Sequence, residues 1–114
     1  MPKSNFVSRG ALKLLHIFEL FKFDIKGSKC ADLGCNIGGF TQVLLQRGAS
    51  EVICVDTAYG ILDWKLRNDP RTSVFERTNA LHAPPPSPLC NFIAIDLGWT
   101  PQSLALPAAV KWCQ

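Results

Sequence analysis

Residues 32–40 read Asp32-Leu33-Gly34-Cys35-Asn36-Ile37-Gly38-Gly39-Phe40, a glycine-rich stretch between an apolar run and a segment of helical periodicity. Glycine lets the backbone approach a ligand without a Cβ clash, so this junction predicts a binding loop between a strand and a helix. A dinucleotide fingerprint requires Gly-x-Gly-x-x-Gly, and Asn36 replaces its second glycine. The loop therefore predicts a ligand other than a pyrophosphate, with a purely structural glycine turn as the alternative.

The segments around this loop alternate between strand and helix patterns. We expect strands at 29–34, 51–56, 73–76 and 91–96, and helices at 10–22, 40–47 and 59–68, with a last helix opened by Pro101 that Pro107 would kink or restart. Ser8 is the expected cap of the first helix. The alternation predicts an α/β, Rossmann-like fold with a doubly wound, mostly parallel sheet whose strand order begins 3-2-1-4.

The chain has 114 residues, of which 47% are hydrophobic, and this predicts a single domain over 1–114. Further strands, at about thirty residues per βαβ unit, are needed to complete a doubly wound sheet. We therefore expect a sheet truncated after its fourth strand, as in a fragment, a shortened chain or a degenerate copy. An exposed sheet edge would favour self-association.

Positive charge is concentrated near the N-terminus. The first 29 residues hold six of the twelve Lys and Arg residues against two acids, Glu19 and Asp24. We interpret 1–28 as a basic lead-in segment with a helix, which suits a nucleic-acid backbone. The alternative is an ordinary solvated helix face.

Cysteine usage and hydropathy exclude several classes of protein. The five cysteines include no Cys-x-x-Cys pair, so we expect free thiols, buried at Cys30 and Cys54, no metal, and a reducing, cytoplasmic setting. The longest uncharged run, Thr78–Ile95, contains four prolines, and no secretory signal opens the chain. The sequence predicts no membrane partner.

Two acids end apolar, β-branched runs that are typical of buried parallel strands. Asp56 lies 22 residues after Gly34, where an acid hydrogen-bonds ribose hydroxyls, and Asp96 ends the fourth expected strand. Both acids should face the carboxyl edge of the sheet, where open α/β sheets bind ligands. The alternative for Asp56 is an acid that caps the next turn. The spacing from Asp32, Asp-x-Gly-x-x-x-Gly, fits the loop of methyltransferases.

Several longer sequence segments show a specific family resemblance that covers nearly the whole chain. The segments 6–14, 38–41, 55–60, 62–71 and 76–80 together resemble the TlyA/hemolysin-A branch of the FtsJ-like RNA 2′-O-methyltransferases. The fold alone does not require these segments, so their occurrence in this order indicates the family more specifically than the glycine loop does. The resemblance implies a class I methyltransferase fold, S-adenosylmethionine as cofactor and RNA as partner, in particular ribosomal RNA or the ribosomal subunit.

The resemblance also implies roles for single residues. It makes Asp32 a cofactor-binding residue and places Gly34, Gly38, Gly39 and Phe40 around the methionine end of the cofactor. The resemblance puts Asp56 on the ribose, Asn79 near the adenine and Asp96 beside the methyl group. Alternatives are that Phe40 is a core residue and that Asn79 is a turn residue.

The family performs the transfer with a Lys-Asp-Lys-Glu tetrad, and Lys13 and Asp96 match its first two members. The second Lys and the Glu have no match, because Lys111 is best interpreted as a solvated lysine. Arg9 and Lys13 are the expected RNA-binding residues. Two alternatives follow: a catalytically inactive RNA-binding or interaction module that retains the cofactor fold, and a methyltransferase of another substrate.

Overall fold

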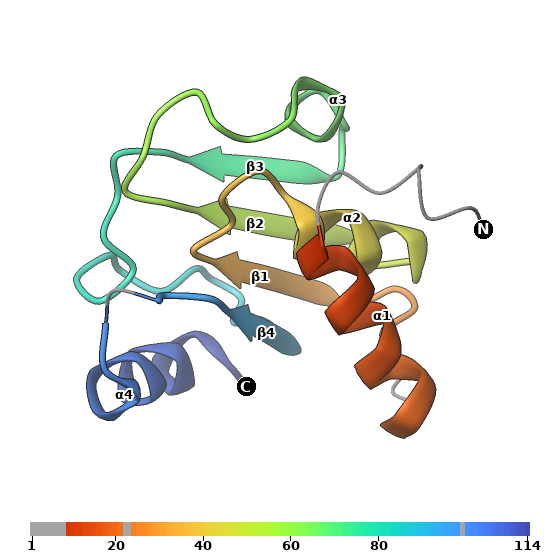
Figure 1. The fold of residues 1–114 in the computed structure, drawn as a ribbon. Helices are drawn as coiled ribbons and strands as arrows, with labels where there is room; N and C mark the ends of the chain where they lie inside the picture. Colours follow the sequence, from red (N-terminus) through yellow and green to blue (C-terminus); the bar gives the residue numbers. More distant parts are fainter. Residues whose placement is uncertain (1–8, 22–23, 99) are drawn as a thin grey trace.

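The structure is a computed structural model that describes residues 9–21, 24–98 and 100–114. Within them, four strands form one parallel sheet, namely β1 (Lys29–Leu33), β2 (Glu51–Val55), β3 (Thr72–Phe75) and β4 (Phe92–Ile95). The strand order is β3-β2-β1-β4 (Figure 1), which confirms the predicted order. All four expected strands are present to within two residues at each end.

Helices lie on both faces of the sheet. They are α1 (Arg9–Phe21), α2 (Gly39–Gln46), α3 (Trp64–Arg67) and α4 (Gln102–Trp112). Successive side chains of a strand point to opposite faces. On β1, Cys30 accordingly belongs to the core beneath α1 and α2, whereas Ala31 and Leu33 belong to the core beneath α4. Figure 1 shows α4 on the side away from α1 and α2, as expected of a doubly wound sheet.

Helix α1 confirms the first expected helix and packs into the core on one face of the sheet. Ala11, Leu14 and Phe18 form a stripe at helical spacing and are buried. Phe18 stacks on Phe92 of β4 with ring centroids 5.6 Å apart. Ser8, the expected cap, lies outside the described residues.

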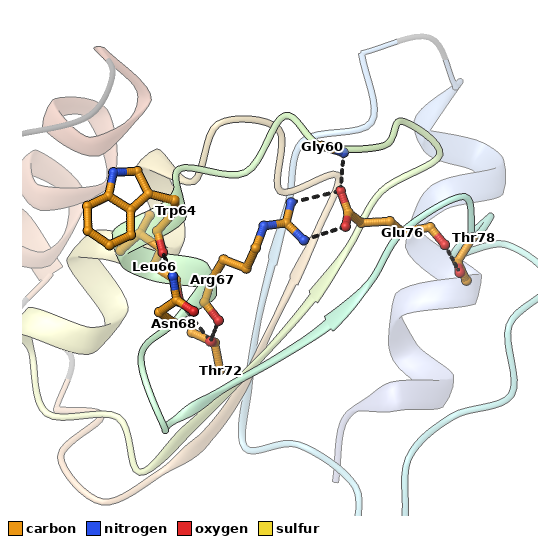
Figure 2. Close-up of polar contacts among 8 residues, drawn as sticks. All are labelled: Gly60, Trp64, Leu66, Arg67, Asn68, Thr72, Glu76 and Thr78. Atoms are coloured by element: carbon orange, nitrogen blue, oxygen red, sulfur yellow. Dashed lines mark hydrogen bonds and ion pairs between the residues drawn. The ribbon is translucent and has the colours of Figure 1, made fainter.

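The expected helix over 59–68 was too long, since α3 spans only its last part. Gly60 adopts a left-handed φ of +74°. Its N–H donates to the carboxylate of Glu76, the residue that directly follows β3 (Figure 2). Asp63 then caps α3 by accepting from the N–H of Lys65 at 2.9 Å. A long-range contact and a cap residue therefore override the helical pattern of 59–63.

Of the two outcomes expected at Pro107, a kink or a restart, the restart does not occur, because α4 runs through Pro107; a kink stays a prediction. Pro107 lies on the exposed side of α4, and Ser103, whose carbonyl loses its partner, is exposed as well. Water can satisfy that carbonyl. Ala105, Ala109 and Trp112 keep the opposite side buried against the sheet.

The expected Pro-rich connection lies between β3 and β4 and is tied to the sheet by Lys29, whose Nζ donates to the Pro88 carbonyl at 2.7 Å. After α4, Cys113 forms a parallel bridge with Cys90 beside β4. Among the described residues, no strand pairs with the outer edge of Phe92–Ile95. This edge is the one at which we predicted self-association, which stays a prediction.

All five cysteines are free. Cys30 and Cys54 are buried, as expected, and burial raises the pKa of the Cys30 thiol to about 12. Such thiols behave as small apolar side chains. In the described part of the chain, none of the helices has the length and apolar character needed to cross a membrane.

Candidate functional site

The glycine loop turns sharply between β1 and α2. Its path needs left-handed backbone at three positions, Gly34 (φ +83°), Asn36 (φ +53°) and Gly38 (φ +110°). Asparagine is one of the few residues that adopt this conformation readily. The N–H groups of Gly34 and Cys35 both donate to the carbonyl of Val55, at 2.8 and 3.0 Å. The loop is thereby fastened across the carboxyl ends of β1 and β2.

Gly34 and Gly38 serve different contacts. A Cβ added at Gly34 would lie 2.3 Å from the carbonyl oxygen of Asp96, so this glycine permits the close approach of the loop to the end of β4. A Cβ at Gly38 would lie 2.4 Å from Leu66 and 2.8 Å from Leu62, so this glycine permits α3 to pack against the loop. A larger residue at Gly34 would displace the backbone at the end of β4, whereas one at Gly38 would first force the Leu62 and Leu66 side chains to shift.

A cavity of about 260 Å³ opens beside the loop. It is lined by residues of the loop, the start of α1, the start of α2 and the end of β4: Gly10, Gly34, Cys35, Asn36, Ile37, Gly39, Phe40 and Asp96. Four of the predicted cofactor residues line it, namely Gly34, Gly39, Phe40 and Asp96. The structure thus brings the end of β4 to the glycine loop, as predicted.

Asp56 joins the glycine loop to the loop that follows β2. Its Oδ2 accepts from the N–H of Asn36 at 2.7 Å, and its Oδ1 accepts from the N–H of Ala58 at 2.9 Å. The alternative interpretation, an acid that caps the next turn, is therefore part of its role. Each oxygen still has a second lone pair for a hydroxyl donor. A ribose contact stays a prediction.

Asp32 lies beneath the loop and is fully buried. Its Oδ2 accepts from the Thr41 hydroxyl of α2 at 2.7 Å, and its Oδ1 has no hydrogen-bond partner among the described residues. Burial raises the pKa of the Asp32 carboxyl to about 7, against the opposing effect of the Thr41 hydrogen bonds, with smaller increases from Asp96 and Asp56. Asp32 therefore ties α2 to β1 as a carboxyl group that titrates near neutrality.

Phe40 and Asn79 both have the structural roles that were given as alternatives to cofactor binding. Phe40 is half-buried, packs against the core and lines the cavity, so both of its interpretations hold in part. The Oδ1 of Asn79 accepts from the N–H of Leu81 at 2.9 Å, which is the turn role. Its proposed adenine contact stays a prediction.

Of the two predicted tetrad residues, Asp96 lines the cavity, whereas Lys13 is not among its lining residues. Asp96 is exposed and borders both this cavity and a second one of about 540 Å³ towards α4. Lys13 is exposed on α1, one turn after Gly10, and residues three apart share a helix face. Arg9 is the first residue of α1, and its side chain lies outside what the structure describes.

Sequence reasoning missed an ion pair that holds the loop between β2 and α3 (Figure 2). Arg67 donates to both carboxylate oxygens of Glu76, at 2.5 and 3.0 Å, and the N–H of Gly60 donates to the same carboxylate. These hydrogen bonds, chiefly those from Arg67, lower the pKa of Glu76 to about 2. Arg67 and Glu76 are nine residues apart, with a turn and β3 between them, and no local sequence pattern predicts a contact between two such positions. Gly10 and residues 35–37 of the cavity were missed as well.

A parallel sheet of this order, with a glycine loop after β1 and acids at the ends of β2 and β4, defines a Rossmann-like methyltransferase fold. Comparison with known proteins agrees. The FtsJ-like methyltransferase family matches residues 6–110, and the chain belongs to this family, in its TlyA/hemolysin branch.

Three relatives illustrate the match. The 16S/23S rRNA (cytidine-2'-O)-methyltransferase TlyA of Mycobacterium tuberculosis is 45% identical over 106 residues, which cover 91% of this chain and 40% of that protein. Hemolysin A of Brachyspira hyodysenteriae is 40% identical over 76 residues, or 67% of this chain and 32% of that protein. A solved structure described as a hemolysin from Streptococcus thermophilus has a TM-score of 0.93 and 37% identity, covering 99% of this chain and 42% of that one. The chain thus spans about two fifths of the TlyA relative.

Replacement of Gly34 by Ala should destabilise the fold by roughly 1–3 kcal/mol, because the left-handed backbone disfavours a side chain and the Cβ would meet the Asp96 carbonyl. Gly98→Ala is the matched control, since an added Cβ there has no atom within 4 Å and should change stability by less than about 0.5 kcal/mol. Urea unfolding followed by circular dichroism measures both. Equal losses in the two variants would contradict the close-approach argument.

The buried Asp32 predicts a pH dependence of stability. Its pKa rises from 3.8 in the unfolded chain to about 7 in the fold, so the native state binds more protons between these values. The stabilisation linked to its proton is complete below about pH 4 and is lost as the pH rises through 7.

Asp32→Asn imitates the protonated acid and should therefore remove this loss. Relative to the variant, the parent should lose up to about 3 kcal/mol of unfolding free energy between pH 5 and pH 8. Urea unfolding of both proteins at the two pH values measures the difference. Parallel pH profiles would show that Asp32 is already ionised in the fold at pH 5.

Proposed function

We propose that this chain is the S-adenosylmethionine-binding part of an RNA ribose 2′-O-methyltransferase that acts on ribosomal RNA in the cytoplasm. The observation that carries the proposal is the cavity at which the glycine loop and Asp96 meet, with Asp56 attached to the same loop, in a chain of the FtsJ-like family. The rRNA (cytidine-2'-O)-methyltransferase activity for which the TlyA relative is named supports the choice of substrate.

The residues at the cavity fit this cofactor. Backbone of the glycine loop lines the cavity, and carboxylates at Asp56 and Asp96 suit a ligand with ribose hydroxyls and two positive charges. The first N–H groups of α2 have no partner within that helix and suit a carboxylate. Asp56 would hold the ribose, and Asp96 would lie beside the reacting end.

The chain's own residues would position the attacking hydroxyl. When bound, S-adenosylmethionine supplies a methyl group on a sulfonium centre, open to in-line displacement. Alignment of the ribose 2′-hydroxyl is a large part of such a reaction. The ammonium of Lys13 can donate a hydrogen bond to that oxygen, and the carboxylate of Asp96 can accept a hydrogen bond from the hydroxyl, which orients it without removing its proton. Arg9 and Lys13 would also contact RNA phosphates.

A second candidate function is an RNA-binding module that retains the cofactor fold without catalysis. The observation in its favour is that the chain matches two of the four tetrad residues, Lys13 and Asp96. The group that would accept the hydroxyl proton, the second Lys, has no counterpart among its 114 residues.

Cofactor binding tests the site. Isothermal calorimetry with S-adenosylhomocysteine should give a dissociation constant for the parent that Asp56→Ala weakens about 10- to 100-fold, through the loss of a charge-assisted hydrogen bond. Asp56→Asn retains an acceptor for the loop and should fall between the two. Asp63→Ala removes an acid that caps α3 and should bind like the parent. Equal affinity of all four proteins would remove Asp56 from the site.

Transfer of tritiated methyl groups to total ribosomal RNA tests catalysis. The 114-residue chain should show no appreciable incorporation, because the missing general base alone costs roughly 10²–10⁴ in rate. The TlyA relative serves as the active control. In any protein that combines this segment with the remaining two tetrad residues, transfer should occur and Lys13→Ala should abolish it. Robust incorporation by the short chain would overturn the assignment of the missing base.

A further inference from the structure

An exposed aromatic ring and a cation are stacked at the carboxyl edge of the sheet, outside the cavity. Tyr59 follows β2 and is 68% exposed, and the guanidinium carbon of Arg77 lies 4.6 Å from the centre of its ring. Tyr59 belongs to neither hydrophobic core. Burial in this chain therefore does not account for the position of the ring.

The backbone beneath this pair is strained and firmly held. Arg77 has a φ of +51°, an uncommon conformation for a residue with a long side chain. Its N–H donates to the carbonyl of Ala58 at 3.1 Å, and the N–H of Thr78 donates to the carbonyl of Asp56 at 2.9 Å. Strain that the surrounding structure maintains is found preferentially at functional positions.

The other side of the pair is equally constrained. Gly60, next to Tyr59, is held by the Glu76 carboxylate, which Arg67 fixes from α3 (Figure 2). The ion pairs among the described residues are Arg67–Glu76 and Arg71–Asp69, and Arg77 takes part in neither. The Arg77 charge also acts on Glu76, but no ion pair within the described part of the chain takes up its guanidinium, which leaves it N–H groups for a phosphate.

We propose that Tyr59 and Arg77 form a stacking site for an unpaired base of RNA, with the Arg77 guanidinium on an adjacent phosphate. The inference rests on the proposed function and extends the RNA surface from Lys13 and Arg9 to the opposite, β2–β3 side of the site. An exposed ring with a cation over it suits a planar, sequence-tolerant ligand that carries negative charge. A preformed platform also reduces the ordering cost of binding.

Fluorescence anisotropy with a labelled 12-residue oligoadenylate RNA tests the site across a range of KCl concentrations. Tyr59→Ala should weaken binding about tenfold with an unchanged salt dependence, because stacking releases no counterions. Tyr59→Phe keeps the ring and should bind like the parent. Arg77→Asn tolerates the left-handed backbone and should lower both the affinity and, by about 0.7, the slope against log salt.

Trp64→Ala is the matched control. Trp64 is 67% exposed in the same connection, and among the described residues no cation lies over its ring. This variant should bind the oligonucleotide like the parent. If Trp64→Ala and Tyr59→Ala lowered the affinity for the oligonucleotide equally, the effect would come from exposed apolar surface in general, and the proposal would be overturned.

Calorimetry with S-adenosylhomocysteine separates the remaining outcomes. Unchanged cofactor affinity in Tyr59→Ala, together with weaker RNA binding, supports the site. Lower cofactor affinity with unchanged RNA binding would assign the pair to the cofactor instead. Parent-like RNA binding in both Tyr59→Ala and Arg77→Asn would overturn this proposal alone, whereas a parent that binds no RNA would overturn the proposed function with it. Self-association that Tyr59→Ala abolishes would assign the ring to a protein partner and equally overturn the proposal.

Discussion

The carboxylate of Asp56 holds together the loops from which the candidate site is built. One oxygen accepts from the glycine loop at Asn36, and the other accepts from Ala58 in the loop after β2. Its backbone carbonyl accepts from Thr78 after β3. Three connections that leave the sheet at one edge thus depend on a single residue. A site formed by loops needs such a link, because loops have no ladder of hydrogen bonds of their own.

Organisation of this edge has a cost in stability. Asp32 is buried with one oxygen unpartnered, three residues adopt left-handed backbone in the glycine loop, and Arg77 adopts it without being glycine. Each departure is unfavourable by itself. The Arg67–Glu76 ion pair and the two hydrophobic cores offset these costs. These unfavourable features lie at or next to the carboxyl edge, where binding is proposed, and the two cores lie beneath it.

Sequence reasoning succeeded where a pattern is local and failed where a distant contact intervened. The runs Glu51–Val55 and Phe92–Ile95 are strands because buried parallel strands need continuous apolar side chains. The helical pattern at 59–63 failed because Glu76, far along the chain, captures the N–H of Gly60. Helix α4 does not restart at Pro107, because the Ser103 carbonyl that loses its helical hydrogen bond is on the exposed side, where water can satisfy it. Glycine spacing predicted a binding loop, but not that Gly38 would admit the side chains of Leu62 and Leu66.

The sequence by itself determined the alternation of strands and helices, the position of the glycine loop, the acids that end β2 and β4, and membership of the FtsJ-like family. These follow from residue order and short-range periodicity, which need no knowledge of spatial neighbours. The tertiary structure alone decided that Gly34 lies against Asp96, that Arg67 pairs with Glu76, and that Arg77 stacks on Tyr59. Each of these contacts joins segments that the parallel crossovers bring to one edge, and pairing of that kind leaves no periodic trace in the sequence.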